Sequence, residues 1–433
     1  MIRRCCALLL PLSLICISLA AQEPAGQNAG ERRRAARTLA RQGADAIPKL
    51  APLLSDADLE VRIEAVKALV EIGTQNSLDP LITATRDNDP EIQIRATDGL
   101  VNFYVPGYVR TGLSSTLRRA GTNIQSRFTD TNDQVIDLYV EVRPEVIQAL
   151  GRLIRGGVSM ESRANAARAA GILRGTAAIP ELLTAVRSKD SRLMYESLVA
   201  LRKIGVKSAV TEITSTVRDP DRKVQVAAIE TAGLLSNREA LPDLREVMKT
   251  TQDREVRRAA LAAIARLPDA ANRGLLVAYL PDRDPQLRGA AAEGLGRLKD
   301  AADLPAIQKA FDDEKDGSAR VSLAFALVMQ GKLEISEFSP LQYLVNTLNS
   351  ATHSGEAQPL LIEAAREPAV LAALHPALRA GTRDEKKGLA WVMAQSGGRD
   401  EVPLLEALTR DTDVTVASEA LRALRTLKLR AEQ

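Results

Sequence analysis

A sequence motif recurs along most of this chain with a period of about 31 residues. Val61 and Ile92 occupy equivalent positions in successive copies, and Val256 and Leu287 repeat their spacing. A fixed period of this length is typical of solenoids, in which each unit buries its apolar face only against its neighbours. The repeat therefore predicts one elongated array, instead of the two or three globular domains that a chain of 433 residues would otherwise suggest.

Each repeat is predicted to contain two helices. One helix follows the pattern Asp-x-x-Val-Arg-x-x-Ala-x-x-Ala-Leu, which is clearest in the copies that begin at Asp58, Asp253 and Asp284. The other often begins near a proline, which fits the first helical turn because its missing N–H costs nothing there. These prolines are Pro48, Pro80, Pro180, Pro242, Pro305, Pro340 and Pro403. We predict an all-α solenoid of about ten or eleven helix pairs.

Glycines mark the expected helix ends, where a residue that tolerates positive φ is favoured. They are Gly73, Gly205, Gly296 and Gly331. Later copies of the motif are fainter and begin near Gly355, Asp384 and Asp413. The repeats are therefore expected to continue to the C-terminal end of the sequence.

The recurring aspartate and arginine favour a structural interpretation. An aspartate at a helix start caps free backbone amides, and an arginine four residues later lies one turn away, where the two can pair. We therefore predict ion pairs within the repeats, arranged as a ladder along the solenoid. The pairs that fit this spacing are Asp58/Arg62, Asp253/Arg257, Asp284/Arg288 and Asp316/Arg320.

The pattern resembles HEAT repeats, in the short form also called PBS-lyase HEAT-like repeats. The resemblance covers roughly residues 31–427, apart from one insertion, and is weak after about residue 350. It implies an armadillo/HEAT-like superhelix in which the helix with the Val-Arg motif lines the concave face. By this resemblance, the candidates for that face are Glu64, Lys67, Glu71, Arg258 and Arg297.

Residues 1–21 have the features of a signal peptide. Arg3 and Arg4 precede an apolar run from Cys5 to Leu19, and small residues follow, so cleavage after Ala20 or Ala21 is expected. An uncleaved N-terminal anchor is the alternative. Residues 22–30, rich in Gly, Pro and polar residues, are expected to form a flexible leader. We expect an exported protein, either periplasmic or secreted.

Removal of this segment also removes all three cysteines and leaves 56 basic against 55 acidic residues. A mature chain without cysteine has neither a disulfide nor a thiolate. Its near-neutral charge argues against a nucleic-acid partner, because phosphate binding needs an excess of Lys and Arg.

One insertion, residues 106–143, separates the repeats of 31–105 from those of 144–433. The segment from Phe103 to Tyr139 holds five of the twelve aromatic residues, and its arginines precede a mainly acidic stretch. Aromatic and Arg side chains carry much of the energy of interfaces, so a protein partner is one interpretation. Peripheral membrane contact is another, and packing on its own repeats is a third. The candidate partner-binding residues are Tyr104, Tyr108, Arg110, Arg118, Arg119, Arg127 and Phe128.

Residue types that carry chemistry are scarce. The two histidines, His353 and His375, are well separated in the sequence, which predicts no metal site, no bound cofactor and no catalytic residues. We therefore expect a non-catalytic scaffold or adaptor that binds a protein partner on its concave face, on the insertion, or on both. The alternatives are an enzyme or chromophore-binding protein of the PBS-lyase type, and a membrane-peripheral protein. The oligomeric state is left open.

Overall fold

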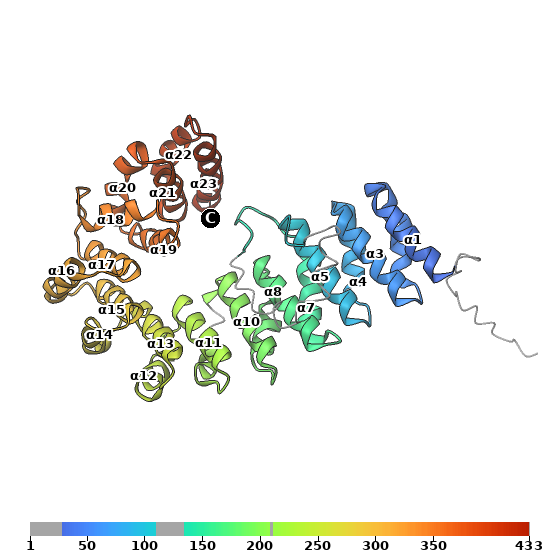
Figure 1. Cartoon of the computed structure of the whole chain (residues 1–433), viewed down its shortest axis with the longest axis horizontal. Coiled ribbons are helices and arrows are strands. Elements are labelled where there is room, and N and C mark those ends of the chain that lie inside the picture. Colours follow the sequence, from blue (N-terminus) through green and yellow to red (C-terminus); the bar gives the residue numbers. More distant parts are fainter. Residues whose placement is uncertain (1–27, 110–133, 208–210, 433) are drawn as a thin grey trace, which may run out of the picture.

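The computed structural model describes residues 28–109, 134–207 and 211–432. Within these ranges the chain forms helices arranged in two layers, and no strand is present. Successive helices alternate between the layers, so each repeat contributes one helix to each of them. The layers curve into an arc, with the inner layer on its concave side (Figure 1). The all-α solenoid predicted from the repeat is thus confirmed.

The inner layer contains the helices that carry the Val-Arg motif. They are α1 (Ala29–Ala40), α3 (Leu59–Ile72), α5 (Pro90–Tyr104), α8 (Met160–Ile172), α10 (Ser191–Ile204), α11 (Arg222–Leu234), α13 (Arg254–Arg266), α15 (Pro285–Leu298), α17 (Gly317–Met329), α19 (Ser354–Ala364), α21 (Arg383–Ser396) and α23 (Val414–Glu432). Each of these helices packs against the next one in the same layer.

The outer layer contains shorter elements, several of which begin with a proline in the first turn. They are α2 (Ile47–Leu50) with η2 (Ala51–Ser55), α4 (Leu78–Ala84), α7 (Pro144–Gly156), α9 (Ile179–Val186), η7 (Thr211–Arg218), α12 (Leu241–Thr250), α14 (Arg273–Tyr279), α16 (Leu304–Asp313), α18 (Pro340–Thr347), α20 (Pro368–Ala380) and α22 (Val402–Leu408). Short 3₁₀ turns lead into many of them: η1 (Gly43–Ala46), η3 (Gln75–Ser77), η5 (Thr176–Ala178), η8 (Arg238–Ala240), η9 (Ala270–Asn272), η10 (Ala301–Asp303) and η11 (Arg399–Glu401).

The N-terminal ends of the inner helices are capped as the motif predicts. The carboxylate of Asp58 accepts a hydrogen bond from the amide of Val61, and Asp253 accepts from the amides of Glu255 and Val256. These amides have no partner inside their own helix, so the cap supplies the acceptor that they lack. The aspartates that cap inner helices in this way are Asp58, Asp89, Asp190, Asp221, Asp253, Asp284 and Asp316.

The predicted helix ends are confirmed at three of the four glycines. Gly73, Gly205 and Gly331 have positive φ values of 57°, 80° and 93°. Gly296 differs, because it lies inside α15, and the left-handed residue that ends this helix is Lys299, with φ 54°. The prediction for Gly296 was therefore wrong, and another property of glycine explains its presence.

Gly296 allows two inner helices to approach closely. A Cβ atom at this position would lie 2.6 Å from Cα of Ala326 on α17, closer than side chains pack. A Cβ atom at Gly233 would likewise lie 2.7 Å from Cα of Ala263 on α13. Small residues at these contacts bring neighbouring inner helices together.

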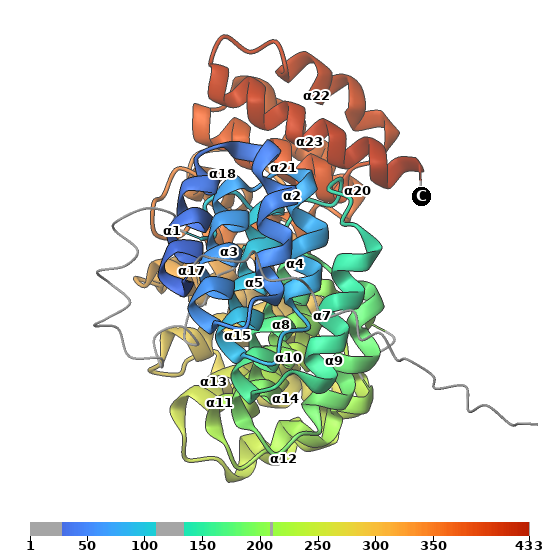
Figure 2. The ribbon, with the colours of Figure 1, turned by 90° about the vertical axis from the view of Figure 1, so that its right-hand side faces the viewer.

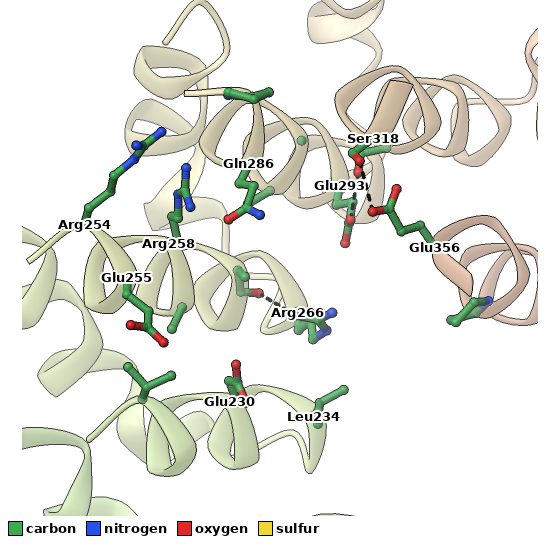
Figure 3. A pocket seen from close by; sticks show the side chains of 18 of the residues that line it. Glu230, Leu234, Arg254, Glu255, Arg258, Arg266, Gln286, Glu293, Ser318 and Glu356 are labelled. Carbon is green, nitrogen blue, oxygen red and sulfur yellow. Dashed lines mark hydrogen bonds between the residues drawn. The ribbon is translucent and has the colours of Figure 1, made fainter. Parts of the chain in front are cut away.

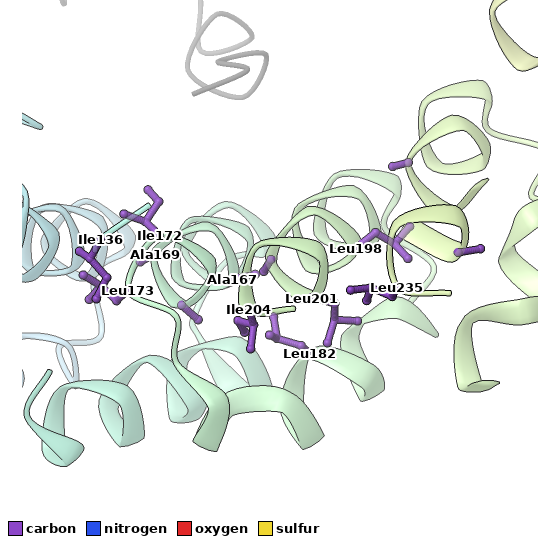
Figure 4. Packing of buried hydrophobic residues seen from close by; sticks show 14 of the residues in the cluster. Ile136, Ala167, Ala169, Ile172, Leu173, Leu182, Leu198, Leu201, Ile204 and Leu235 are labelled. Carbon is purple, nitrogen blue, oxygen red and sulfur yellow. The ribbon is translucent and has the colours of Figure 1, made fainter. Parts of the chain in front are cut away.

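A continuous apolar core fills the space between the layers, from Ala36 to Leu427. Figure 4 shows a part of it in which Leu182 of the outer helix α9 lies next to Leu201 and Ile204 of α10. Alanine and leucine make up much of this core, so few aromatic residues are needed to fill it. Because each unit buries its apolar face against the next, stability is spread along the array.

The C-terminal units, which are faint in the sequence, keep the same stacking. Helices α19, α21 and α23 begin at Ser354, Arg383 and Val414, close to the starts predicted for these repeats. Helices α20 to α23 then return toward the middle of the chain (Figure 1), and in Figure 2 α22 and α23 lie above the N-terminal repeats. Within the described ranges, no helix combines the length and the hydropathy needed to cross a membrane.

Candidate partner-binding surface

The concave face contains a large open groove of about 1180 Å³. Side chains from six consecutive inner helices, α10, α11, α13, α15, α17 and α19, line it. Figure 3 shows part of this lining, with α13 crossing the view and Glu293, Ser318 and Glu356 beyond its C-terminal end. The Val-Arg helices therefore line the concave face, in accordance with the expectation from the resemblance.

The floor of the groove consists of small and apolar residues. Ala259 and Ala262 of α13 lie beside Gly289 and Ala290 of α15, so the helix backbones are close to the groove surface. Leu234, at the end of α11, is 47% exposed and is one of the few large hydrophobic side chains left open on the described surface. This combination provides an apolar strip on which another chain can rest.

Arginines on one side of the groove are held by carboxylates of the next repeat. Arg258 donates from Nε and Nη2 to the two carboxylate oxygens of Asp284, at 2.7 and 2.9 Å. Arg254 donates from Nε to the same carboxylate at 2.9 Å. Burial favours a higher pKa for Asp284, but these hydrogen bonds outweigh it and lower the pKa to about 2. Two cations that line the groove thus share one buried carboxylate.

Two other groove arginines are also paired. Arg222 forms ion pairs with Asp253 and Glu255 of the following repeat, and Arg202 contacts Glu230 at 2.5 Å. Arg266 is different, because among the described residues it forms no ion pair, and its Nη1 donates only to the carbonyl of Ala262, at 3.5 Å. Figure 3 shows its guanidinium directed into the groove.

The carboxylates on the opposite side are also engaged. Glu293 accepts hydrogen bonds from Ser322 Oγ and from Arg297 Nη2, each at 3.0 Å. Glu356 accepts from Ser318 Oγ at 2.9 Å, and its other oxygen lies 3.2 Å from Nδ1 of His353. These contacts fix the acidic side chains in place along α15 and α19.

The sequence-based candidates for the concave face divide into two groups. Arg258 lines the groove, whereas the Arg297 side chain is only 7% exposed, because it contacts Glu293 and Glu363 and lies over the Phe325 ring. The Glu363 pKa is favoured upward by burial, but the bonds from Arg297 lower it overall, with a smaller contribution from the charge of Arg266. Arg297 therefore joins α15 to α19 inside the structure.

Near the N-terminal end, Glu64 is likewise buried and joins inner helices. Its carboxylate accepts from Arg37 of α1 at 2.9 Å and from Lys67 at 2.7 Å. Burial favours a higher Glu64 pKa, but these two bonds lower it overall. Glu71 is exposed on the same helix.

The ladder of aspartates and arginines exists, but its connections differ from the prediction. Arg62 donates from Nε to Asp87 of the next repeat at 2.9 Å, and from Nη1 to the carbonyl of Asp56 in its own preceding loop. It does not pair with Asp58, whose carboxylate is occupied as the helix cap. Similarly, Arg288 pairs with Glu314 of the next repeat. The predicted pairs within a repeat were wrong, because Arg62 and Arg288 reach carboxylates of the next repeat instead.

The sequence reading missed the acidic residue that completes this ladder. Asp56 and Asp87 stand two positions before a capping aspartate, and each accepts a hydrogen bond from the amide of that cap, at 2.9 and 2.8 Å. The same arrangement occurs in the loops at 219–221, 282–284, 314–316 and 411–413. The recurring Asp-x-Asp spacing, with Glu314 at the first position in one copy, was the available signal for it.

Two of the predicted partner-binding residues lie among the described residues. Tyr104 accepts a hydrogen bond on its hydroxyl from the amide of Arg143, and its ring meets that of Phe103 edge-on at 4.9 Å. Tyr108 packs against the core, and burial, followed by the charge of Asp98, raises its pKa. Both tyrosines therefore join the insertion to the repeats. Arg110, Arg118, Arg119, Arg127 and Phe128 lie outside the described residues.

The end of the insertion connects distant parts of the chain. The Ile136 amide donates to the Ile172 carbonyl at the end of α8, at 3.0 Å, and its side chain is buried. Asp137, the next residue, accepts from Arg422 of the last helix at 2.9 and 3.0 Å. The Asp137 carboxylate also accepts from the Tyr139 hydroxyl, at 2.8 Å. Sequence reasoning did not find the contact with Arg422, which spans 285 positions.

The two histidines are far from forming a metal centre. His353 contacts Glu356 and Ser318, whereas His375 lies 3.5 Å from Glu401. Across residues 28–109, 134–207 and 211–432, no group of three or more His, Cys, Asp or Glu side chains is arranged to hold a metal ion.

Comparison with known proteins agrees with this geometry. A family model described as HEAT repeats matches residues 22–101, 210–282 and 249–328. No curated protein matches the chain.

Solved structures that match the chain include YibA of E. coli, with 14% identity, 70% coverage of this chain and 98% of that one, and a TM-score of 0.42. The complex of CpcE and CpcF of phycocyanin lyase from Nostoc sp. has 18% identity, coverages of 69% and 92%, and a TM-score of 0.32. Kap121p has 12% identity, coverages of 92% of this chain and 48% of that one, and a TM-score of 0.39. With TM-scores below 0.5, these structures carry no argument about function. The family model thus identifies HEAT repeats in residues 22–101, 210–282 and 249–328, and the stacked helix pairs give the described chain a HEAT-like α-solenoid fold.

Proposed function

We propose that this protein is a non-catalytic scaffold or adaptor that binds a protein partner in its concave groove. The observation that carries the proposal is the groove itself, which extends over six inner helices and has a volume of about 1180 Å³. A surface of this length collects many modest contacts over a large area, which suits an extended segment of another protein.

The carboxylates of the groove are engaged in ion pairs and hydrogen bonds, which supports binding over catalysis. A general acid or base needs a carboxyl or imidazole group that is free to exchange a proton with a substrate. In the groove, Arg202 and Arg222 hold Glu230, Asp253 and Glu255, and hydroxyl groups hold Glu293 and Glu356. Such fixed side chains provide a surface of defined shape and charge.

We also propose that the protein acts outside the cytoplasm, in the periplasm or after secretion. This part of the proposal rests on the N-terminal sequence alone, with Arg3 and Arg4 before an apolar run. Residues 1–27 lie outside the described part of the chain. A partner is therefore to be sought among envelope or extracellular proteins.

Site-specific photo-crosslinking in the native host tests the scaffold proposal. A photoreactive amino acid replaces Leu234, which is 47% exposed in the groove, and a matched variant carries it at Val277, which is 38% exposed on the outer helix α14. We expect one defined protein adduct from position 234 and not from position 277. The absence of an adduct at 234, or equal adducts at both positions, would contradict the proposal.

A further inference from the structure

We propose that the groove selects a protein segment that places a carboxylate on Arg266 and an apolar side chain next to it on Leu234. This inference rests on the proposed function, since it specifies the chemistry of the partner for the same groove. It follows from the ion pairs among the described groove residues, in which Arg266 takes no part.

The first step concerns the arginines that line the groove. Four of them, Arg202, Arg222, Arg254 and Arg258, form ion pairs with carboxylates. Arg266 lines the same groove and has no ion pair among the described residues. Its guanidinium therefore retains donor positions for an external acceptor.

The second step concerns the carboxylates. Arg202 and Arg222 neutralise Glu230, Asp253 and Glu255, all on α11, α13 and the loop between their repeats. On the far side, Glu293 and Glu356 accept hydrogen bonds from serine hydroxyls. Among the described groove residues, Arg266 is thus the arginine that forms no ion pair within the protein.

The surroundings of Arg266 determine what can accompany the anion. Leu234 and Arg266 belong to the adjacent inner helices α11 and α13, and Figure 3 shows them at the same end of the groove. Ala262, one turn before Arg266, forms part of the floor, and Leu360 of α19 lies on the other side. An apolar side chain seated here excludes water and strengthens the adjacent ion pair.

The charges nearby favour a carboxylate over a phosphate. Nucleic acids and phosphorylated ligands are bound by clusters of cations. Here Arg254 and Arg258 are committed to Asp284, and Glu230, Glu293 and Glu356 line the same groove as Arg266. A single negative charge on a polypeptide matches one guanidinium and is repelled less by these carboxylates than a dianion would be.

Peptide selection on the immobilised full chain tests the inference. Random twelve-residue peptides displayed on phage are selected against the wild-type chain and against Arg266→Ala, Arg266→Lys and Arg266→Glu. The matched control is Arg238→Glu, which reverses an exposed arginine in η8 that does not line the groove. Circular dichroism first establishes that all variants fold.

We expect the peptides selected by the wild type to combine Asp or Glu with a neighbouring apolar residue. Arg266→Ala weakens their binding roughly tenfold or more, since a hydrogen bond to a charged group is lost. Arg266→Lys retains part of the affinity, Arg266→Glu shifts the selection toward Lys and Arg, and Arg238→Glu changes nothing. Groove peptides without acidic residues, or with unchanged affinity for Arg266→Ala, would overturn the inference.

The result also separates this inference from the scaffold proposal. If position 234 still crosslinks a protein while the selected peptides are indifferent to Arg266, the scaffold proposal stands and the carboxylate inference fails. If neither peptides nor a crosslinked protein are obtained, both fail. Displacement of the bound peptides by millimolar inorganic phosphate, together with preference for phosphorylated peptides, would identify a phosphate site and also overturn the inference.

Discussion

At the scale of single residues, the close approach of the inner helices depends on the absence of side chains at a few positions. Gly296 lies within a helix, where glycine ordinarily costs about 1 kcal/mol relative to alanine. A Cβ atom there would be 2.6 Å from Cα of Ala326, so α15 and α17 would have to separate. We expect Gly296→Ala to destabilise the protein by roughly 1–3 kcal/mol, through overpacking. A lower midpoint of urea unfolding, followed by circular dichroism, checks this.

The control for this substitution is Gly274→Ala in the outer helix α14. A Cβ atom at Gly274 meets no other atom within 4 Å, so alanine adds only its better helix propensity. We expect this variant to unfold at the same or a higher urea concentration than the wild type. If Gly296→Ala behaved in the same way as Gly274→Ala, the packing argument would be refuted.

At the scale of elements, Asp284 connects two inner helices and titrates far below the usual range. It caps α15 through the Gln286 amide and accepts from Arg254 and Arg258 of α13. Its pKa is lowered from 3.8 to about 2 in the folded chain, so the ionised form is favoured by folding. That stabilisation is complete above about pH 4 and is lost as the pH falls toward 2.

We therefore expect Asp284→Asn to unfold more easily by about 2 kcal/mol at pH 7, since a shift of one pKa unit corresponds to about 1.4 kcal/mol. The difference from the wild type shrinks between about pH 4 and pH 2. Chemical unfolding at a series of pH values measures it. Asp312→Asn, at an exposed position in α16, serves as the control, and a constant difference for Asp284→Asn down to pH 2 would count against this account.

At the scale of the whole molecule, a salt bridge closes the superhelix. Arg422 of α23 contacts Asp137 beside α8, and its guanidinium lies 5.8 Å from the centre of the Trp391 ring. The Arg422 side chain is 44% exposed, so salt screens this contact. We expect Arg422→Ala, or high ionic strength, to open the superhelix, which would increase the distance between the N-terminal ends of α8 and α23.

Spin labels measure this opening directly. Every cysteine of the sequence lies at or before Cys16, so a chain that begins at Gln22 accepts two engineered cysteines without interference. Met160 and Val414 are exposed at the N-terminal ends of α8 and α23 and provide the positions. Arg425→Ala is the control, because Arg425 is exposed and forms no ion pair within the described part of the chain. An unchanged distance in Arg422→Ala would show that stacking alone holds the curvature.

The repeat in the sequence was sufficient to predict the two-layered helical array, the capping aspartates and the C-terminal units that begin near residues 355, 384 and 413. These features are local, because a cap or an apolar stripe depends on residues within one or two turns. Contacts between repeats were predicted less well. Arg62 was expected to pair with Asp58, but it reaches Asp87, since its position relative to the next repeat depends on the rotation between units.

The sequence alone thus determined the fold class of this protein, because a short period leaves each unit only its neighbours as partners. Which helices line the concave face was implied by the resemblance to HEAT repeats. The tertiary structure decided which of the many arginines pair with a carboxylate and which remain open. It left Arg266 open in the groove and brought Arg422 to Asp137 across 285 positions. Small rotations between successive units add up over the whole array. Surfaces and long-range contacts depend on this total rotation, which the sequence of a single repeat does not determine.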